Sequence, residues 1–242
     1  MGRHGTIANR KASQDSKRAQ VFTKYARAIT VAAKNGGDPD YNMGLKHAID
    51  KAKSINMPND NITRAIKKGT GELAGETYEE NSFEGYGAGG VAVIVDVLTD
   101  NRNRSTAAVK HAFDKFGGNL GAMGCVSYMF DRKGVIIIEK TASVGEDALM
   151  ETALEAGMED MLTEEDSYEI LTTPESFNDV AETLKKANYE LAFADIEYVP
   201  SIEATPTDEH DIKNLKKMIA LLEENDDVQK VHHNCTIDLS EE

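Results

Sequence analysis

Three short stretches with helical apolar spacing open the chain, and none of them can bury its apolar side alone. The first begins at Ser13, has apolar residues every three or four positions from 21 to 33, and stops at Gly36 and Gly37, as expected for one face of a helix. The second covers about residues 42–55. The third begins with Asn56 as its cap and stops at Gly69. Because each stripe needs a partner to cover it, the pattern predicts a three-helix bundle over residues 1–76.

Buried strands alternate with amphipathic helices after residue 77. VAVIVDVL predicts a strand, an amphipathic helix follows it, and CVSYMFD and RKGVIIIE predict two more strands. From Lys133 the order is strand, helix, strand, strand, helix, strand, which is typical of a ferredoxin-like module. A last helix and the strand VQKVHHNCTI can complete the earlier strand–helix–strand. The predicted fold is therefore α+β, a three-helix bundle followed by two α/β (ferredoxin-like) domains, residues 77–131 plus 206–242 and an inserted domain at 132–205.

The charge of the chain is divided at the same boundary. The whole sequence carries 27 Lys and Arg and 42 Asp and Glu, but residues 1–76 hold 14 basic and 7 acidic side chains. The first module is thus basic and the remainder strongly acidic, which indicates separate electrostatic roles. Either the basic module binds a polyanion, or it docks on the acidic part of its own chain.

The leading hypothesis is that one side of the first helix, together with the basic arm before it, contacts phosphates. The arm has no apolar periodicity and is expected to be mobile. The candidate nucleic-acid-binding residues are Arg3, Arg10, Lys11, Lys17, Arg18, Lys24, Arg27 and Lys34. A solvated helix face is the simpler alternative.

Two loops carry further candidate residues. The sequence TDNRNRS joins a buried strand to a helix, where unpaired N–H groups favour anions; its candidate anion or partner residues are Asp100, Asn101, Arg102, Asn103 and Arg104. The alternative there is a helix cap whose arginines pair with nearby acids. A candidate RNA-contact loop comprises Met57, Pro58, Asn59, Asp60 and Asn61, and a plain helix start explains it equally well.

Other signals for chemistry are weak. Gly85, Gly87 and Gly90 have the spacing of a dinucleotide fingerprint, but they precede a strand and not a helix, so a turn between two strands is favoured. His232 and His233 are neighbours in a predicted strand and face opposite sides, which argues against a shared metal. Two distant cysteines form no disulfide scaffold, and no catalytic motif is present. We therefore expect no enzyme activity, cofactor, metal or small-molecule substrate.

Five segments in order, RKASQDSKRAQVFTK, AIDKAKSINMPNDNITRAIKKGTGE, EGYGAGGVAV, LTDNRNRS and GGNLGAMGCVSYMF, resemble the YebC/PmpR family across essentially the whole chain. Mitochondrial relatives in that family activate translation of a cytochrome oxidase subunit. The resemblance implies three domains and a cytoplasmic protein. No apolar run approaches the roughly 20 residues that a membrane-spanning helix needs, so no membrane partner is expected. It also implies a DNA-binding transcriptional regulator or, alternatively, a factor associated with the ribosome and its RNA. Many members begin with a tryptophan-containing arm that is absent here, whereas Lys11, Lys17, Arg18 and Lys24 match the family motif.

A further alternative is a protein-interaction module. Residues 132–207 contain 5 basic and 18 acidic side chains, which make a poor phosphate-binding surface and a candidate docking surface for a protein partner. Solubility alone also explains such a composition.

Overall fold

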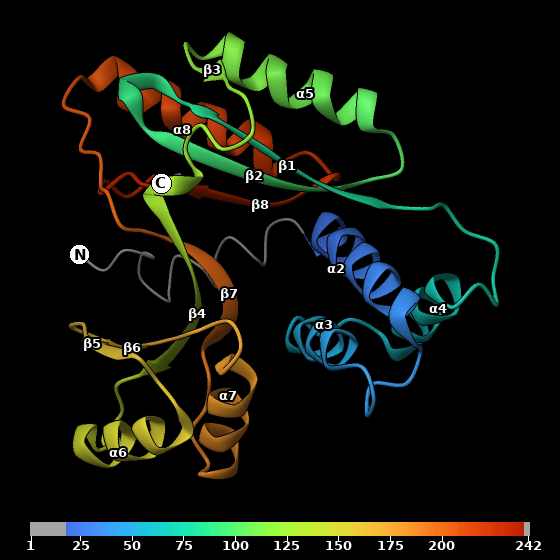
Figure 1. The fold of residues 1–242 in the computed structure, drawn as a ribbon, viewed down its shortest axis with the longest axis vertical. Helices are drawn as coiled ribbons and strands as arrows, with labels where there is room; N and C mark the ends of the chain where they lie inside the picture. The colour runs from blue at the N-terminus through green and yellow to red at the C-terminus, as the bar shows by residue number, and fades with distance from the viewer. Residues whose placement is uncertain (1–17, 240–242) are drawn as a thin grey trace. The chain divides into compact units, whose positions relative to one another are not determined.

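The computed structural model describes residues 18–239, and the helical bundle occupies the first part of this range. Its elements are α2 (Arg18–Ala32), the 3-10 helix η1 (Ala33–Asn35), α3 (Met43–Ser54) and α4 (Asn59–Gly69) (Figure 1). Ile29, Leu45 and Ala52 are fully buried at the centre of the bundle. These residues belong to the apolar stripes of the sequence, so the predicted bundle is confirmed. The proposed arm and Ser13 lie outside the described residues.

The end of α4 lies unusually close to α2. A Cβ atom at Gly69 would lie 2.3 Å from the carbonyl oxygen of Thr30 and 2.6 Å from the Cβ of Ala33, so only glycine fits without a shift of backbone. The start of α4 differs from the prediction. Pro58 is the N-cap residue, and Asn56 has a left-handed φ of 59° in the turn after α3. The prediction that Asn56 caps this helix was wrong because the chain turns once more before the helix begins.

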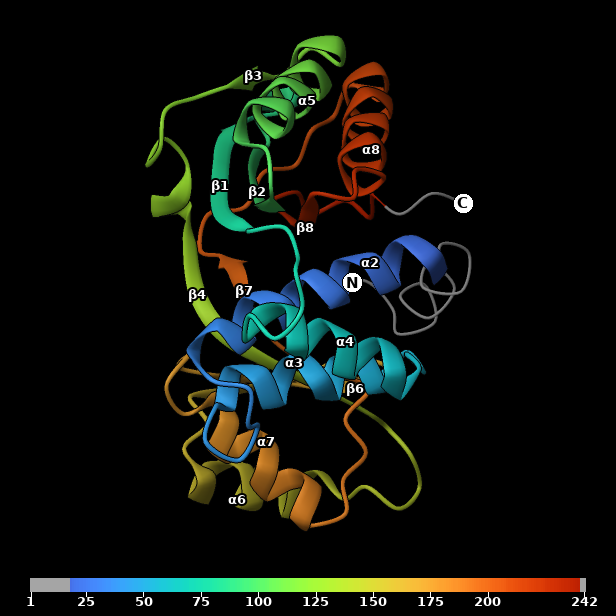
Figure 2. The same ribbon diagram turned by 90° about the vertical axis from the view of Figure 1, so that its right-hand side faces the viewer.

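The structure has two sheets. The first contains three strands that precede those of the second sheet in the sequence and one strand that follows them. Its four antiparallel strands have the order β3-β1-β2-β8. The elements are β1 (Glu79–Tyr86), the 3-10 helix η2 (Ala88–Gly90), β2 (Ala92–Thr99), α5 (Arg102–Lys115), β3 (Asn119–Leu120), α8 (Glu209–Glu223) and β8 (Val228–His233). Phe113 of α5 and Leu215 and Met218 of α8 pack with the valines of β2, so both helices cover one face of this sheet (Figure 2).

The glycine-rich segment between β1 and β2 is a turn between strands, as the sequence favoured. A Cβ at Gly85 would lie 2.5 Å from the carbonyl oxygen of Asn119, and one at Gly87 would lie 2.7 Å from Cδ1 of Leu215. These glycines are therefore explained by the close approach of β3 and α8. A nucleotide is not needed to account for them.

The second sheet has the strand order β5-β6-β4-β7, all antiparallel. Its elements are the 3-10 helix η3 (Ser127–Met129), β4 (Phe130–Glu139), α6 (Glu146–Ala156), β5 (Asp160–Thr163), β6 (Ser167–Thr172), α7 (Phe177–Lys186) and β7 (Phe193–Pro200). Leu149 of α6 and Phe177 and Leu184 of α7 pack on Ile136 and Ile170 of the sheet. The predicted fold class is confirmed, including the ferredoxin-like order of the later module.

One predicted strand is absent. The segment CVSYMFD forms a turn and the helix η3, and the strand β4 begins only at Phe130. The N–H groups of Gly124 and Val126 both donate to the carboxylate of Glu84, at 2.8 and 3.0 Å. These contacts fix residues 124–126 as a loop, although the apolar residues alone favoured a strand.

By their contacts the described residues form two compact units, 18–126 with 204–239, and 127–203. The first unit contains the bundle and the first sheet, and the second contains the ferredoxin-like sheet. Among the described helices, none combines the length and apolar character that crossing a membrane demands.

Candidate nucleic-acid interface

Arg27, one of the predicted nucleic-acid-binding residues, is largely buried at the start of β8. Its Nη1 atom donates to Oδ1 of Asp227 and to the carbonyl oxygen of Asp226, both at 2.6 Å. The guanidinium also lies over the ring of Tyr78, 5.3 Å from the ring centre. Only 14% of the Arg27 side chain is exposed. Nucleic acid could bind this arginine only by replacing these contacts.

Lys24 and Lys34 also bind groups of their own chain. Nζ of Lys24 donates to the carbonyl oxygen of Glu223 at 2.8 Å, and Nε2 of Gln20 donates to that of Glu224 at 3.1 Å. Both carbonyls lie at the C-terminal end of α8, where unpaired carbonyls carry partial negative charge, and the last turn of α8 has no basic residue. Nζ of Lys34 donates to the carbonyl oxygen of Tyr78 at 2.7 Å. The side chains of all three described candidates thus contact a later part of the same chain.

Asp227 is the centre of this contact, and its side chain is 4% exposed. It accepts hydrogen bonds from Arg27, Arg104, Ser105 and Thr99. Burial alone would raise the pKa of this carboxyl, but the hydrogen bonds from Ser105, Arg104, Arg27 and Thr99 outweigh it, so the pKa is lowered. Asp227 is therefore held as a carboxylate that joins α2, α5 and β8.

The loop at residues 100–104 supplies another part of the same contact. Oδ1 of Asn101 accepts the N–H of Arg104 at 3.1 Å and so caps α5. Nη2 of Arg104 donates to Asp100 at 2.6 Å and to Asp227 at 2.8 Å. Arg102 and Asn103 are exposed. Asn101 thus caps α5 and Arg104 pairs with nearby acids, as in the second of the two alternatives that the sequence left open.

The surface beside this loop does not have the charge of an anion site. It contains a hollow of about 380 Å³, which is lined by Arg27, Glu76, Asp100, Arg104, Asn225, Asp226 and Asp227. Acids outnumber arginines in this lining, so a phosphate there would be repelled.

The MPNDN segment forms the entrance to α4. Met57 is buried in the bundle core, Pro58 is the N-cap residue, and Asn59 and Asp60 are exposed in the first turn. Asn61 is half-buried. The segment therefore has the geometry of a plain helix start, and the buried side chain of Met57 is unavailable to RNA.

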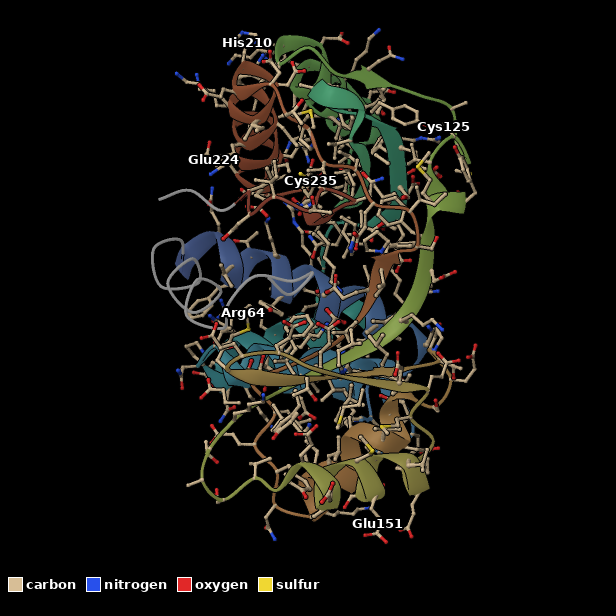
Figure 3. The ribbon with its side chains drawn as sticks, turned by 90° about the vertical axis from the view of Figure 1, so that its left-hand side faces the viewer. Arg64, Cys125, Glu151, His210, Glu224 and Cys235 are labelled. Carbon is tan, nitrogen blue, oxygen red and sulfur yellow. The ribbon has the colours of Figure 1, made fainter. Side chains whose placement is uncertain are left out.

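Besides Lys34, the exposed basic side chains that the structure describes in the bundle lie on α4 and at the end of α3. They are Lys53, Arg64, Lys67 and Lys68, and Figure 3 labels Arg64 on α4. Within the described residues, none of the four forms an ion pair or a side-chain hydrogen bond. Uncompensated cations on these two helices suit a phosphate backbone. We call Lys53, Arg64, Lys67 and Lys68 the α4 basic face.

The sequence interpretation missed these residues, although a signal was present. Arg64, Lys67 and Lys68 are spaced i, i+3 and i+4, which places them on one side of a helix. Ile62 and Ala65, which mark the opposite side, are buried. The other predicted residues, Arg3, Arg10, Lys11 and Lys17, lie outside the described residues, and so does the side chain of Arg18.

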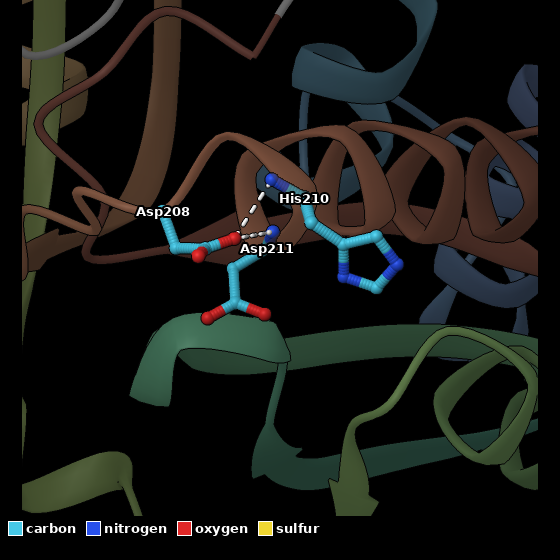
Figure 4. A group of neighbouring side chains, drawn as sticks. All are labelled: Asp208, His210 and Asp211. Atoms are coloured by element: carbon cyan, nitrogen blue, oxygen red, sulfur yellow. Dashed lines mark hydrogen bonds between the residues drawn. The ribbon is translucent and has the colours of Figure 1, made fainter.

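Neither histidine-containing cluster offers a well-formed metal site among the described residues. Asp208, His210 and Asp211 lie close together at the start of α8 (Figure 4). There, Oδ1 of Asp208 accepts the N–H groups of His210 and Asp211 at 2.8 and 3.1 Å, which is helix capping. In β8, His232 is buried with Nε2 3.2 Å from Oδ2 of Asp96, while His233 faces the opposite side of the strand.

Comparison with known proteins identifies the family. The model for the N-terminal domain of TACO1/YebC proteins matches residues 3–72, and that for their second and third domains matches residues 78–235. This chain belongs to the TACO1/YebC family. The resemblance seen in the sequence is therefore confirmed.

Relatives in the TACO1/YebC family match nearly the full length of the chain. A probable transcriptional regulatory protein of Clostridioides difficile is 56% identical, covering 98% of this chain and 100% of that protein. A probable transcriptional regulatory protein of Geobacter sulfurreducens is 51% identical, covering 98% of this chain and 95% of that protein. The crystal structure of a conserved hypothetical protein from Aquifex aeolicus matches with a TM-score of 0.84 at 46% identity, covering 94% of this chain and 93% of that one.

Proposed function

We propose that this protein is a non-catalytic, cytoplasmic regulator of transcription that binds the phosphate backbone of DNA through the α4 basic face. The observation that supports this most strongly is the exposure of Lys53, Arg64, Lys67 and Lys68 without acidic partners in the described chain, which is otherwise acidic. The names of the relatives, probable transcriptional regulatory proteins, favour the same function.

Backbone contact is a better match to this surface than base reading. The exposed side of α4 has one arginine and two lysines in its second half, and its first half offers Asn59, Asp60 and Thr63. Lysines act as point charges on phosphates and carry no sequence information. We therefore expect affinity to depend strongly on salt and weakly on base sequence.

A salt titration tests the proposal. If all four residues of the α4 basic face meet phosphates, the logarithm of the affinity for duplex DNA should fall with the logarithm of salt with a slope of about −3 to −4. The triple variant R64E/K67E/K68E should lose most of this slope. A matched control, K110E/K213E/K217E, makes the same change in net charge at exposed lysines of α5 and α8 and should retain it.

Two results would contradict the proposal. The first is an unchanged slope in the α4 variant, and the second is an equal loss in the control, which would show that only net charge matters. The target needs a separate measurement, crosslinking in cells followed by sequencing of the bound nucleic acid. Recovery of DNA supports the proposal, whereas recovery of ribosomal RNA alone would replace transcription with translation.

A further inference from the structure

The side of α6 that faces solvent carries an apolar row. Leu149 and Ala153 of this helix are buried against the ferredoxin-like sheet. On the other side, Leu154 and Met150 are 62% and 41% exposed. These two residues are four positions apart, so their side chains are neighbours on the helix surface. A single exposed apolar side chain is ordinary, whereas adjacent ones are a feature of contact surfaces.

A row of carboxylates borders this apolar row. Asp147, Glu151 and Glu155 follow one another at intervals of four residues, and all three are exposed. Asp147 stands three positions before Met150, and Glu151 stands three positions before Leu154, so the two rows lie side by side. Figure 3 labels Glu151, whose side chain points away from the sheet. We call Asp147, Met150, Glu151, Leu154 and Glu155 the outer face of α6.

The three carboxylates of the outer face are uncompensated. Within the part of the chain that the structure describes, none of them forms an ion pair or a side-chain hydrogen bond, and α6 contains no basic residue. Like charges four positions apart repel one another, and Glu155 lies in the last turn, where the helix dipole disfavours an acid. Folding therefore does not explain the acidic row, and solubility does not explain the apolar row beside it.

We propose that the outer face of α6 binds a basic amphipathic helix of a partner protein. The acidic row attracts lysine and arginine and repels nucleic acid, and residues 132–207 around it hold 5 basic and 18 acidic side chains. An extended segment presents one row of side chains on each face, whereas a helix presents two adjacent rows on one side. A helix with a basic row beside an apolar row therefore matches both rows of the outer face at once. The contact does not rest on nucleic-acid binding.

The contact is short and depends on charge. From Asp147 to Glu155 the helix rises by about 12 Å, which corresponds to about two turns of a partner helix. An interface of this size belongs to the weak and transient class. Because exposed charges are screened by salt, we expect the affinity to fall at least about tenfold between about 0.05 and 0.5 M salt.

A model peptide tests the surface on the full-length protein. The probe is a fluorescent peptide of about 18 residues, or five helical turns, with leucines in one row and lysines in the next. Fluorescence anisotropy measures its binding. M150A/L154A should weaken binding about tenfold through loss of apolar contact. D147N/E151Q/E155Q should weaken it at least about fivefold and remove most of the salt dependence. All five side chains are exposed, so both variants should keep the wild-type circular dichroism spectrum.

Matched controls separate the outer face from general charge and stickiness. E175Q/D179N/E190Q removes three charges from exposed acids of the same unit outside α6, and Y128A/I202A removes two exposed apolar side chains. Both variants should bind the peptide as the wild type does. A peptide of the same composition in shuffled order, without an apolar row, should bind the wild type at least about tenfold more weakly. Equal losses in the α6 variants and their controls, or equal binding of the two peptides, would overturn the proposal.

Photo-crosslinking in cells identifies the natural partner. The variant Met150→p-benzoylphenylalanine places a photoreactive group in the apolar row, and mass spectrometry locates the linked peptide. We expect a segment of another protein in which basic and apolar residues repeat at helical spacing, and D147N/E151Q/E155Q in the same chain should reduce its yield at least about fivefold. A link to a second copy of this chain, to nucleic acid or to an acidic segment would contradict the proposal. So would a yield no higher than that of a control probe at Glu175.

Discussion

Replacing the buried Asp227 with asparagine should strongly destabilise the first unit. The pair with Arg27 is buried, with 4% and 14% of the two side chains exposed, and Asp227 also serves Arg104, Ser105 and Thr99. Removing one partner of a buried ion pair typically costs about 3–5 kcal/mol. Arg104 is half-exposed and can rehydrate, so we expect about 3 kcal/mol for D227N.

A double-mutant cycle with R27M separates the ion pair from the other contacts. R27M alone should cost about 2 kcal/mol, because Asp227 keeps its remaining donors. The double variant should lose less than the sum of the two, with a coupling energy of at least about 1 kcal/mol. The measurement is urea unfolding followed by circular dichroism.

Asp226 supplies a matched control for this cycle. Arg27 contacts the backbone carbonyl of Asp226 and not its side chain, so D226N should change the free energy of unfolding by less than about 0.5 kcal/mol. Additive effects of R27M and D227N, or a cost below about 1 kcal/mol for D227N, would refute the assignment of Asp227 as the residue that joins the bundle to the sheet.

Other predictions concern pH, backbone packing and capping. The pKa of Asp227 is lowered in the folded protein. Its contribution to the free energy of unfolding should therefore be complete above the unfolded pKa of about 3.9 and be lost as pH falls through the folded pKa. The difference in stability between wild type and D227N should shrink in acid, and a difference that grows below pH 4 would contradict the lowered pKa. G69A should lower the free energy of unfolding by about 1–3 kcal/mol, since a Cβ there meets the backbone of Thr30. G44A, in an open position of α3, should instead stabilise the protein by about 0.5–1 kcal/mol. Thermal melts of the two variants measure both effects, and equal effects would refute the argument that α4 approaches α2 closely at Gly69. N101A should cost about 1 kcal/mol through loss of the α5 cap, while N103A, at an exposed neighbour, should be neutral in urea unfolding.

Much of the fold was predictable because apolar spacing is a local signal. The stripes of the three helices and the strand order after Lys133 depend on residues within a few positions of one another. The strand predicted at CVSYMFD failed because Glu84, some forty residues earlier, binds the N–H groups of Gly124 and Val126. No local pattern reports such a contact.

The candidate site was less predictable for the same reason. Arg27 looks like an exposed cation in the sequence, and its partner Asp227 is 200 residues away. Lys24 binds a backbone carbonyl, for which the sequence carries no signal at all. Arg64 and its neighbours on α4 follow a local spacing and could have been found. The greater number of basic residues on α2 and in the arm drew the prediction there.

Chemical labelling of lysines tests the central claim most directly, because the account separates cations that are already engaged from those that are available. Acetylation with and without duplex DNA can be quantified at each lysine by mass spectrometry. We predict fast acetylation of Lys53, Lys67 and Lys68 in the free protein and protection by DNA, with slow acetylation of Lys24 and Lys34 in both states. Fast labelling of Lys24 and Lys34 that DNA suppresses, with Lys67 and Lys68 unaffected, would contradict the account.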